Sequence, residues 1–141
     1  MIVVDVNFLI HFFFPSDFSP ITEKVFLKDP VWISPLLWRS EFRNVLLGFV
    51  RKNIIDYSKA IEGIEKAEIK MQGAEHPVSS SQVMDLGRSS NCSAYDCEYV
   101  ALAKTKELIL LTWDARILRA FPEFSRNPEK YLENTEVIFD R

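Results

Sequence analysis

Residues 93–114 have the sequence SAYDCEYVALAKTKELILLTWD, and this stretch decides the fold. Ser93 is typical of the residue that caps a helix N-terminus, and the apolar positions after it indicate a helix through Ala103. Residues 108–111 then form a continuous aliphatic run, which is typical of a strand covered on both faces. A helix followed by such a strand predicts an α/β architecture built on parallel strands.

The rest of the chain continues this alternation. Three further apolar runs are predicted strands, at residues 2–4, 31–33 and 137–139. Pro35 suits a first helical position, and an apolar stripe extends that helix to about Lys52. Further helices are predicted at about residues 58–72 and 81–88, with surface loops at residues 73–77 and 126–129. The order of elements predicts an α/β sandwich with right-handed crossovers.

The composition indicates a single domain, residues 1–141, because 141 residues that are 48% hydrophobic provide one packed core. The formal charge of −3 argues against a protein that holds nucleic acid on a broad basic surface. Cys92 and Cys97 match no zinc-binding spacing, so we expect buried free thiols. The first residues match neither a signal peptide nor a membrane span, which predicts a cytoplasmic protein.

Four acidic residues fall where a parallel sheet binds ligands. Asp5 directly follows the first predicted strand, and Asp114 follows the strand at residues 108–111. Ligands bind at the carboxyl ends of such strands. Glu41 lies at the edge of its helix's apolar stripe, and Asp96 shares a helix face with the apolar positions four and seven residues later. We therefore expect the four acids to converge.

Four carboxylates in one pocket repel one another unless they are protonated or balanced by a cation. Oxygen ligands select a hard ion such as Mg²⁺, and Mn²⁺ accepts the same ligands. Such an ion can activate a water and stabilise the charge on a phosphodiester under attack. Each acid also has a purely structural interpretation, because Asp5, Asp96 and Asp114 suit helix N-termini and Glu41 can pair with an arginine.

Four motifs resemble the PIN-domain family, and most of all the VapC-type toxins of prokaryotic toxin–antitoxin pairs. They are VVDVNFLI at residues 3–10, SPLLWRSE at 34–41, SAYDCEYVALA at 93–103 and LLTWD at 110–114. The resemblance implies a PIN-like three-layer α/β/α sandwich with a mostly parallel sheet of about five strands, so a missing strand is expected near residues 77–79. It also implies a Mg²⁺- or Mn²⁺-dependent endoribonuclease, often a homodimer, that is blocked by a small antitoxin.

The resemblance assigns roles to individual residues as well. Four acids would be catalytic and bind the metal, the glutamate directly or through a water: Asp5, Glu41, Asp96 and Asp114. Asn7 and Thr112 would orient these acids. Three arginines are candidates for contacts with RNA phosphates, with solvation or surface ion pairs as the alternative: Arg39, Arg43 and Arg116.

Several alternatives stay open. A nuclease of RNA maturation would share these residues, whereas a toxin needs a small antitoxin gene beside its own. A non-catalytic binding module would not need four acids, and aspartyl-phosphate chemistry would need a lysine at a strand end that the sequence does not place there. Trp113 suits core packing or base stacking. Glu98 points about 200° away from Asp96 around a helix, which leaves it outside the predicted site.

Overall fold

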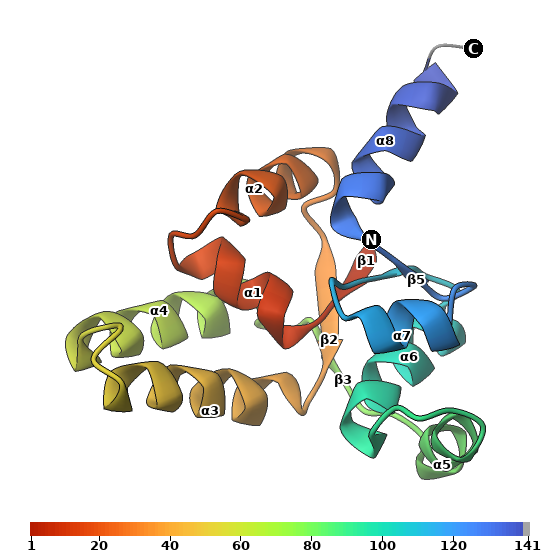
Figure 1. Ribbon diagram of the computed structural model, residues 1–141, viewed down its shortest axis with the longest axis horizontal. Helices are drawn as coiled ribbons and strands as arrows, with labels where there is room; N and C mark the ends of the chain where they lie inside the picture. The colour runs from red at the N-terminus through yellow and green to blue at the C-terminus, as the bar shows by residue number, and fades with distance from the viewer. Residues whose placement is uncertain (140–141) are drawn as a thin grey trace.

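Helices cover both faces of a central parallel sheet (Figure 1). The computed structural model describes the backbone of residues 1–139 and the side chains of residues 1–133. Its elements are β1 (Ile2–Val4), α1 (Val6–Phe13), α2 (Ser19–Lys28), β2 (Trp32–Pro35), α3 (Trp38–Arg51), α4 (Tyr57–Lys70), β3 (Glu75–His76), α5 (Ser80–Arg88), α6 (Ala94–Lys106), β4 (Leu110–Leu111), α7 (Ala115–Ala120), β5 (Ser125–Arg126) and α8 (Pro128–Phe139).

The five strands have the order β3-β2-β1-β4-β5, and every neighbouring pair is parallel. Figure 1 shows α1 to α4 on one side of the sheet and α5 to α7 on the other. The predicted PIN-like α/β/α sandwich with about five strands is therefore confirmed, and the sheet is parallel throughout.

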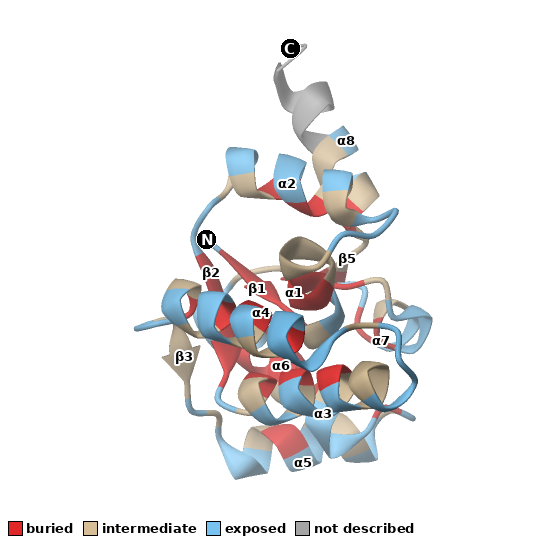
Figure 2. Ribbon diagram, turned by 90° about the vertical axis from the view of Figure 1, so that its left-hand side faces the viewer, coloured by how far each residue is buried: buried red, intermediate tan, exposed pale blue. Residues whose placement is uncertain are grey.

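The core lies between the sheet and the helices on each face, where Figure 2 shows most of the buried residues. All residues of β1 and β4 are buried, as their continuous apolar sequences predict. Helix α3 buries Trp38, Phe42 and Leu46, which are four residues apart and form one face. Helix α6 buries six of its 13 residues, all between Cys97 and Ala103, and contacts β1, β2 and β4.

Four details of the predicted elements differ in the structure. The missing strand is β3 at Glu75–His76, inside a predicted loop and just before residues 77–79. Strand β5, Ser125–Arg126, was not predicted and overlaps the start of the loop expected at residues 126–129. Residues 137–139 belong to helix α8 instead of a strand. Pro35 ends β2, and α3 begins three residues later. Both missed strands are two-residue edge strands with polar sequences, so no hydrophobic pattern marks them.

Cys92 and Cys97 are buried free thiols, as predicted. Helices α1 and α4 approach closely at Gly63, where a Cβ atom would lie 2.1 Å from the Phe14 ring. Within the described part of the chain, no helix has both the length and the apolar character that crossing a membrane requires.

Candidate active site

Two aspartates start the helices that follow the adjacent strands β1 and β4. Asp5 caps α1, and its Oδ1 accepts a hydrogen bond from the Phe8 N–H at 3.0 Å. Asp114 caps α7, and its Oδ1 accepts one from the Ile117 N–H at 2.9 Å. The parallel pairing of β1 with β4 brings both carboxylates to the carboxyl edge of the sheet. The capping role and a place in the predicted site are thus compatible.

Thr112 connects these two aspartates. Its fully buried hydroxyl donates to Asp5 Oδ2 at 2.5 Å and accepts from the Asp114 N–H at 3.0 Å. This contact with Asp5 is the kind that the predicted orienting role of Thr112 requires. Asn7 is exposed, and among the described residues no hydrogen bond joins its side chain to an acid.

The Asp5 carboxylate is 7% exposed and carries a charge that its surroundings disfavour. Burial raises its pKa from the ordinary 3.8 to about 6, although the bonds from Thr112 and Phe8 act in the opposite direction. The neighbouring carboxylates of Asp114 and Glu41 raise this pKa further. A bound cation would relieve both the desolvation and the repulsion.

Glu41 lies in the first turn of α3 and is half-buried. Its Oε1 accepts a 2.6 Å hydrogen bond from the hydroxyl of Tyr99, a buried residue of α6. Burial raises the pKa of Glu41, and the nearby Asp96 and Glu98 raise it as well. The expectation that Glu98 lies outside the site stays a prediction, although its charge is among those that raise the pKa of Glu41. Tyr99 contacts a predicted acid and is a residue that sequence reasoning missed.

Asp96 is held at the start of α6 by the cap residue Ser93, whose Oγ accepts from the Asp96 N–H at 3.1 Å. The half-exposed Asp96 carboxylate itself makes no hydrogen bond among the described residues. The Asp96 charge is among those that raise the pKa of Glu41, and the charges of Asp114 and Glu41 are among those that raise the pKa of Asp5. Electrostatic repulsion therefore links the four predicted acids in pairs: Asp114 with Asp5, Asp5 with Glu41, and Glu41 with Asp96.

The donor set fits a hard cation, because all four side chains offer carboxylate oxygens. Among the described residues, however, no three His, Cys, Asp or Glu side chains are already arranged to hold a metal ion. The hydrogen bonds of Asp5, Glu41 and Asp114 hold them in their present positions. Ion binding would therefore require some of these side chains to change position.

Solved structures provide the comparison, since the sequence matches no protein-family model and no curated protein. PAE2754 from Pyrobaculum aerophilum is 18% identical, with a TM-score of 0.75 over 96% of this chain and 88% of that one. A toxin–antitoxin complex from Klebsiella pneumoniae is 15% identical, with a TM-score of 0.65 over 91% and 98%. VapC20 of Mycobacterium tuberculosis, a toxin that cleaves the sarcin–ricin loop, is 14% identical, with a TM-score of 0.62 over 85% and 95%.

The chain has the PIN-like fold of VapC-type toxins. The three structures cover between 85% and 96% of this chain. At these identities the likeness extends to the fold, and the roles of individual residues stay predictions.

The three arginines occupy different places on this PIN-like fold. Arg39 bonds Glu75 through two nitrogens, each at 2.7 Å, and Glu68 at 3.1 Å, so it ties α3 to β3 and α4. These contacts favour the structural alternative for Arg39. Arg43 and Arg116 are exposed and form no ion pair with a described residue.

Arg116 lies on the same side of the PIN-like fold as the acids. Burial raises the pKa of Cys92, and the charges that also act on this thiol include Asp96, Asp114 and Arg116. Because Cys92 lies in the loop before α6, Arg116 is near the start of that helix. Among the three arginines, it is the best placed for a phosphate that enters the site.

Trp113 packs against the first helices of the PIN-like fold. Its ring centroid lies 5.7 Å from that of Phe8, 5.5 Å from that of His11 and 5.1 Å from that of Phe18. Its indole N–H donates to the Glu129 carboxylate of α8 at 2.9 Å. These contacts favour core packing over base stacking for Trp113.

Proposed function

We propose that the protein is a Mg²⁺- or Mn²⁺-dependent endoribonuclease that hydrolyses RNA phosphodiester bonds. The observation that supports this proposal most is Asp5, a buried carboxylate at the end of β1 whose pKa is raised to about 6 by burial and, further, by the neighbouring Asp114 and Glu41. Its buried charge opposes the stability that the cap of α1 contributes. Perturbed acids in a cluster are typical of sites whose charge is completed by a ligand.

A divalent cation bound there would supply an activated water and stabilise the charge that develops on the phosphodiester. Asp5, Asp96 and Asp114 would hold it, with Glu41 as a further ligand or as acceptor for a water. Thr112 keeps Asp5 directed at the site, and Ser93 fixes the start of α6 from which Asp96 projects. Arg116 would bind an RNA phosphate by charge-assisted hydrogen bonds.

RNA is the proposed substrate because VapC20, which has the same fold, is named a sarcin–ricin loop cleaving toxin. By the same reasoning we propose that the chain is a toxin whose partner is a small antitoxin, since the Klebsiella neighbour is a toxin–antitoxin complex. A cytoplasmic location and a homodimer belong to this proposal. A nuclease of RNA maturation and a non-catalytic binding module are the alternatives.

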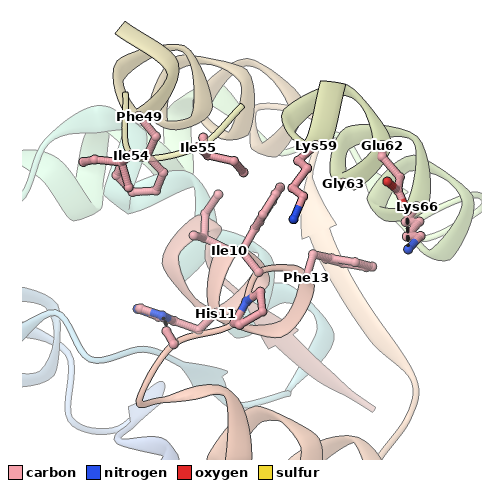
Figure 3. Close-up of a pocket in the computed structure, with 13 residues that line it drawn as sticks. Ile10, His11, Phe13, Phe49, Ile54, Ile55, Lys59, Glu62, Gly63 and Lys66 are labelled. Carbon is pink, nitrogen blue, oxygen red and sulfur yellow. Dashed lines mark hydrogen bonds and ion pairs between the residues drawn. The ribbon is translucent and has the colours of Figure 1, made fainter. Parts of the chain in front are cut away.

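The antitoxin has a suitable docking place in a cavity of about 540 Å³ between the end of α1, the end of α3 and α4 (Figure 3). Its walls are mainly apolar and include Phe13, Phe49 and Ile55. Lys66 is paired with Glu62 at 2.9 Å, whereas Lys59 points from α4 toward α1 and forms no ion pair with a described residue. An antitoxin segment with apolar side chains and a carboxylate would satisfy both features.

The test of the nuclease is cleavage of total cellular RNA by the pure protein in Mg²⁺ or Mn²⁺. We expect discrete fragments that disappear with a chelator and with Asp96→Asn. A matched control is Asp17→Asn, which removes an exposed carboxylate that is not one of the four acids. If the wild type and Asp96→Asn give the same fragments, the proposed active site is wrong.

The test of the partner uses the product of a small gene adjacent to this one. Lys59→Glu should weaken binding of that product, whereas the exposed Lys52→Glu should not. Inhibition of RNA cleavage by the adjacent gene product would support the toxin. A chromosome with no such gene beside this one would favour RNA maturation instead.

A further inference from the structure

The hydroxyl of Tyr99 lies among acidic side chains although the residue is only 2% exposed. It donates to Glu41 Oε1 at 2.6 Å, which links α6 to α3 across 58 positions of sequence. Burial raises the pKa of Tyr99, and Glu41, Asp5 and Glu98 raise it further. A tyrosine hydroxyl is protonated near neutral pH, so Tyr99 is a neutral donor to Glu41.

Glu41 has few other constraints on its carboxylate. Among the described residues it forms no ion pair, and its second oxygen, Oε2, has no hydrogen-bond partner. A long side chain in the first turn of a helix has several rotamers available. The bond from Tyr99 selects one of them and occupies a single oxygen.

A buried tyrosine needs a partner for its hydroxyl in any protein, so the bond alone does not define a role. The identity of the acceptor is what distinguishes Tyr99. It bonds one of the four acids of the site from the helix that carries another, Asp96, three residues earlier. Removing the Tyr99 hydroxyl would therefore alter the position of the Glu41 carboxylate.

We propose that Tyr99 is a positioning residue of this site: its hydroxyl fixes Glu41 through Oε1 and leaves Oε2 available to the cation site shared with Asp5 and Asp96. This inference rests on the proposed metal-dependent nuclease. Outer hydrogen bonds that orient metal-binding side chains commonly affect metal affinity by about 10-fold or more.

The experiment is calorimetric titration of the full chain with Mn²⁺, without RNA. Tyr99→Phe keeps the ring and removes only the hydroxyl, so it should lower Mn²⁺ affinity by about 10-fold. Tyr95→Phe is the matched control, because Tyr95 lies one turn earlier in the same helix and is 61% exposed, and it should bind like the wild type. Thermal unfolding of each variant reports whether the fold is retained.

A double-mutant cycle with Glu41→Gln shows whether Tyr99 acts through Glu41. Adding Tyr99→Phe to Glu41→Gln should cause little further loss of affinity. If Tyr99→Phe binds Mn²⁺ like the wild type, or loses the same factor in both backgrounds, the inference is wrong while the nuclease proposal stands. If the wild type itself binds no Mn²⁺, the proposed function is overturned and the inference with it.

Discussion

At the scale of single residues, the Asp5 carboxylate accepts hydrogen bonds that hold the fold, but no ion pair with a described residue balances its charge. Its carboxylate caps α1 and accepts from Thr112, but burial raises its pKa to about 6. A carboxyl group with a raised pKa in the folded state holds a proton that the unfolded chain releases. The metal-free protein should therefore lose stability as the pH rises from about 4 to about 6 and then remain at that lower level.

Asp5→Asn should accordingly stabilise the metal-free protein near neutral pH. Asparagine is also a good N-cap, and it removes the buried charge. A pKa raised from 3.8 to about 6 corresponds to up to about 3 kcal/mol in favour of the variant. Chemical denaturation in a chelator at about pH 7.5 and about pH 4 measures this, and the gain should largely vanish at the lower pH.

The exposed Asp17→Asn is the control for that comparison. It should change the free energy of unfolding little at either pH. An Asp5→Asn protein that is less stable than the wild type at neutral pH would contradict the view that the Asp5 charge is a cost of the site.

The sequence predicts the four acids because each has a position relative to a strand end or a helix face. It does not predict the contact that Tyr99 makes with Glu41. Tyr99 has the spacing of a core residue, and it is one, since only its hydroxyl reaches Glu41.

At the scale of the elements, Arg39 holds α3, the helix that carries Glu41, against neighbouring elements. The bonds from Arg39 to Glu75 and Glu68 join α3 to an edge strand and to α4. Arg116, at the start of α7, forms no ion pair with a described residue. The two arginines should therefore respond differently to removal.

Arg116→Ala should weaken RNA binding and lower its dependence on salt by about one phosphate contact. Arg39→Ala should leave RNA affinity nearly unchanged and lower stability only modestly, because its ion pairs are partly exposed. Fluorescence anisotropy with labelled RNA, in an Asp96→Asn background that prevents cleavage, measures the first effect. Equal losses of RNA affinity in both variants would show that Arg39 also contacts RNA.

The sequence predicts those helices and strands whose residues are buried, because burial requires an apolar pattern. The buried strands β1, β2 and β4 and the helices α3 to α6 follow apolar patterns and caps. The strands β3 and β5 exist through backbone bonds to a neighbouring strand, with Glu-His and Ser-Arg as their residues. The apolar run at residues 137–139 matches a strand, but it continues a helix that begins at Pro128.

At the scale of the whole molecule, the site exists only when four segments between Asp5 and Asp114 are assembled. A cation bound there would stabilise the folded chain and not the unfolded one. Mg²⁺ or Mn²⁺ should raise the midpoint of thermal unfolding, adding about 2.7 kcal/mol at about 100 times the dissociation constant. Asp96→Asn should reduce this gain, and an equal gain in the variant would indicate that the ion binds elsewhere.

The convergence of the acids on a cation is tested most directly by anomalous diffraction from crystals of the protein containing Mn²⁺. The account predicts an anomalous peak bound by Asp5, Asp96 and Asp114, with Glu41 as a direct ligand or bonded to a water on the ion. The peak should be lost in Asp96→Asn crystals. Well-ordered crystals at saturating Mn²⁺ with no peak among these carboxylates would contradict the account and leave the four acids as helix caps and surface charges.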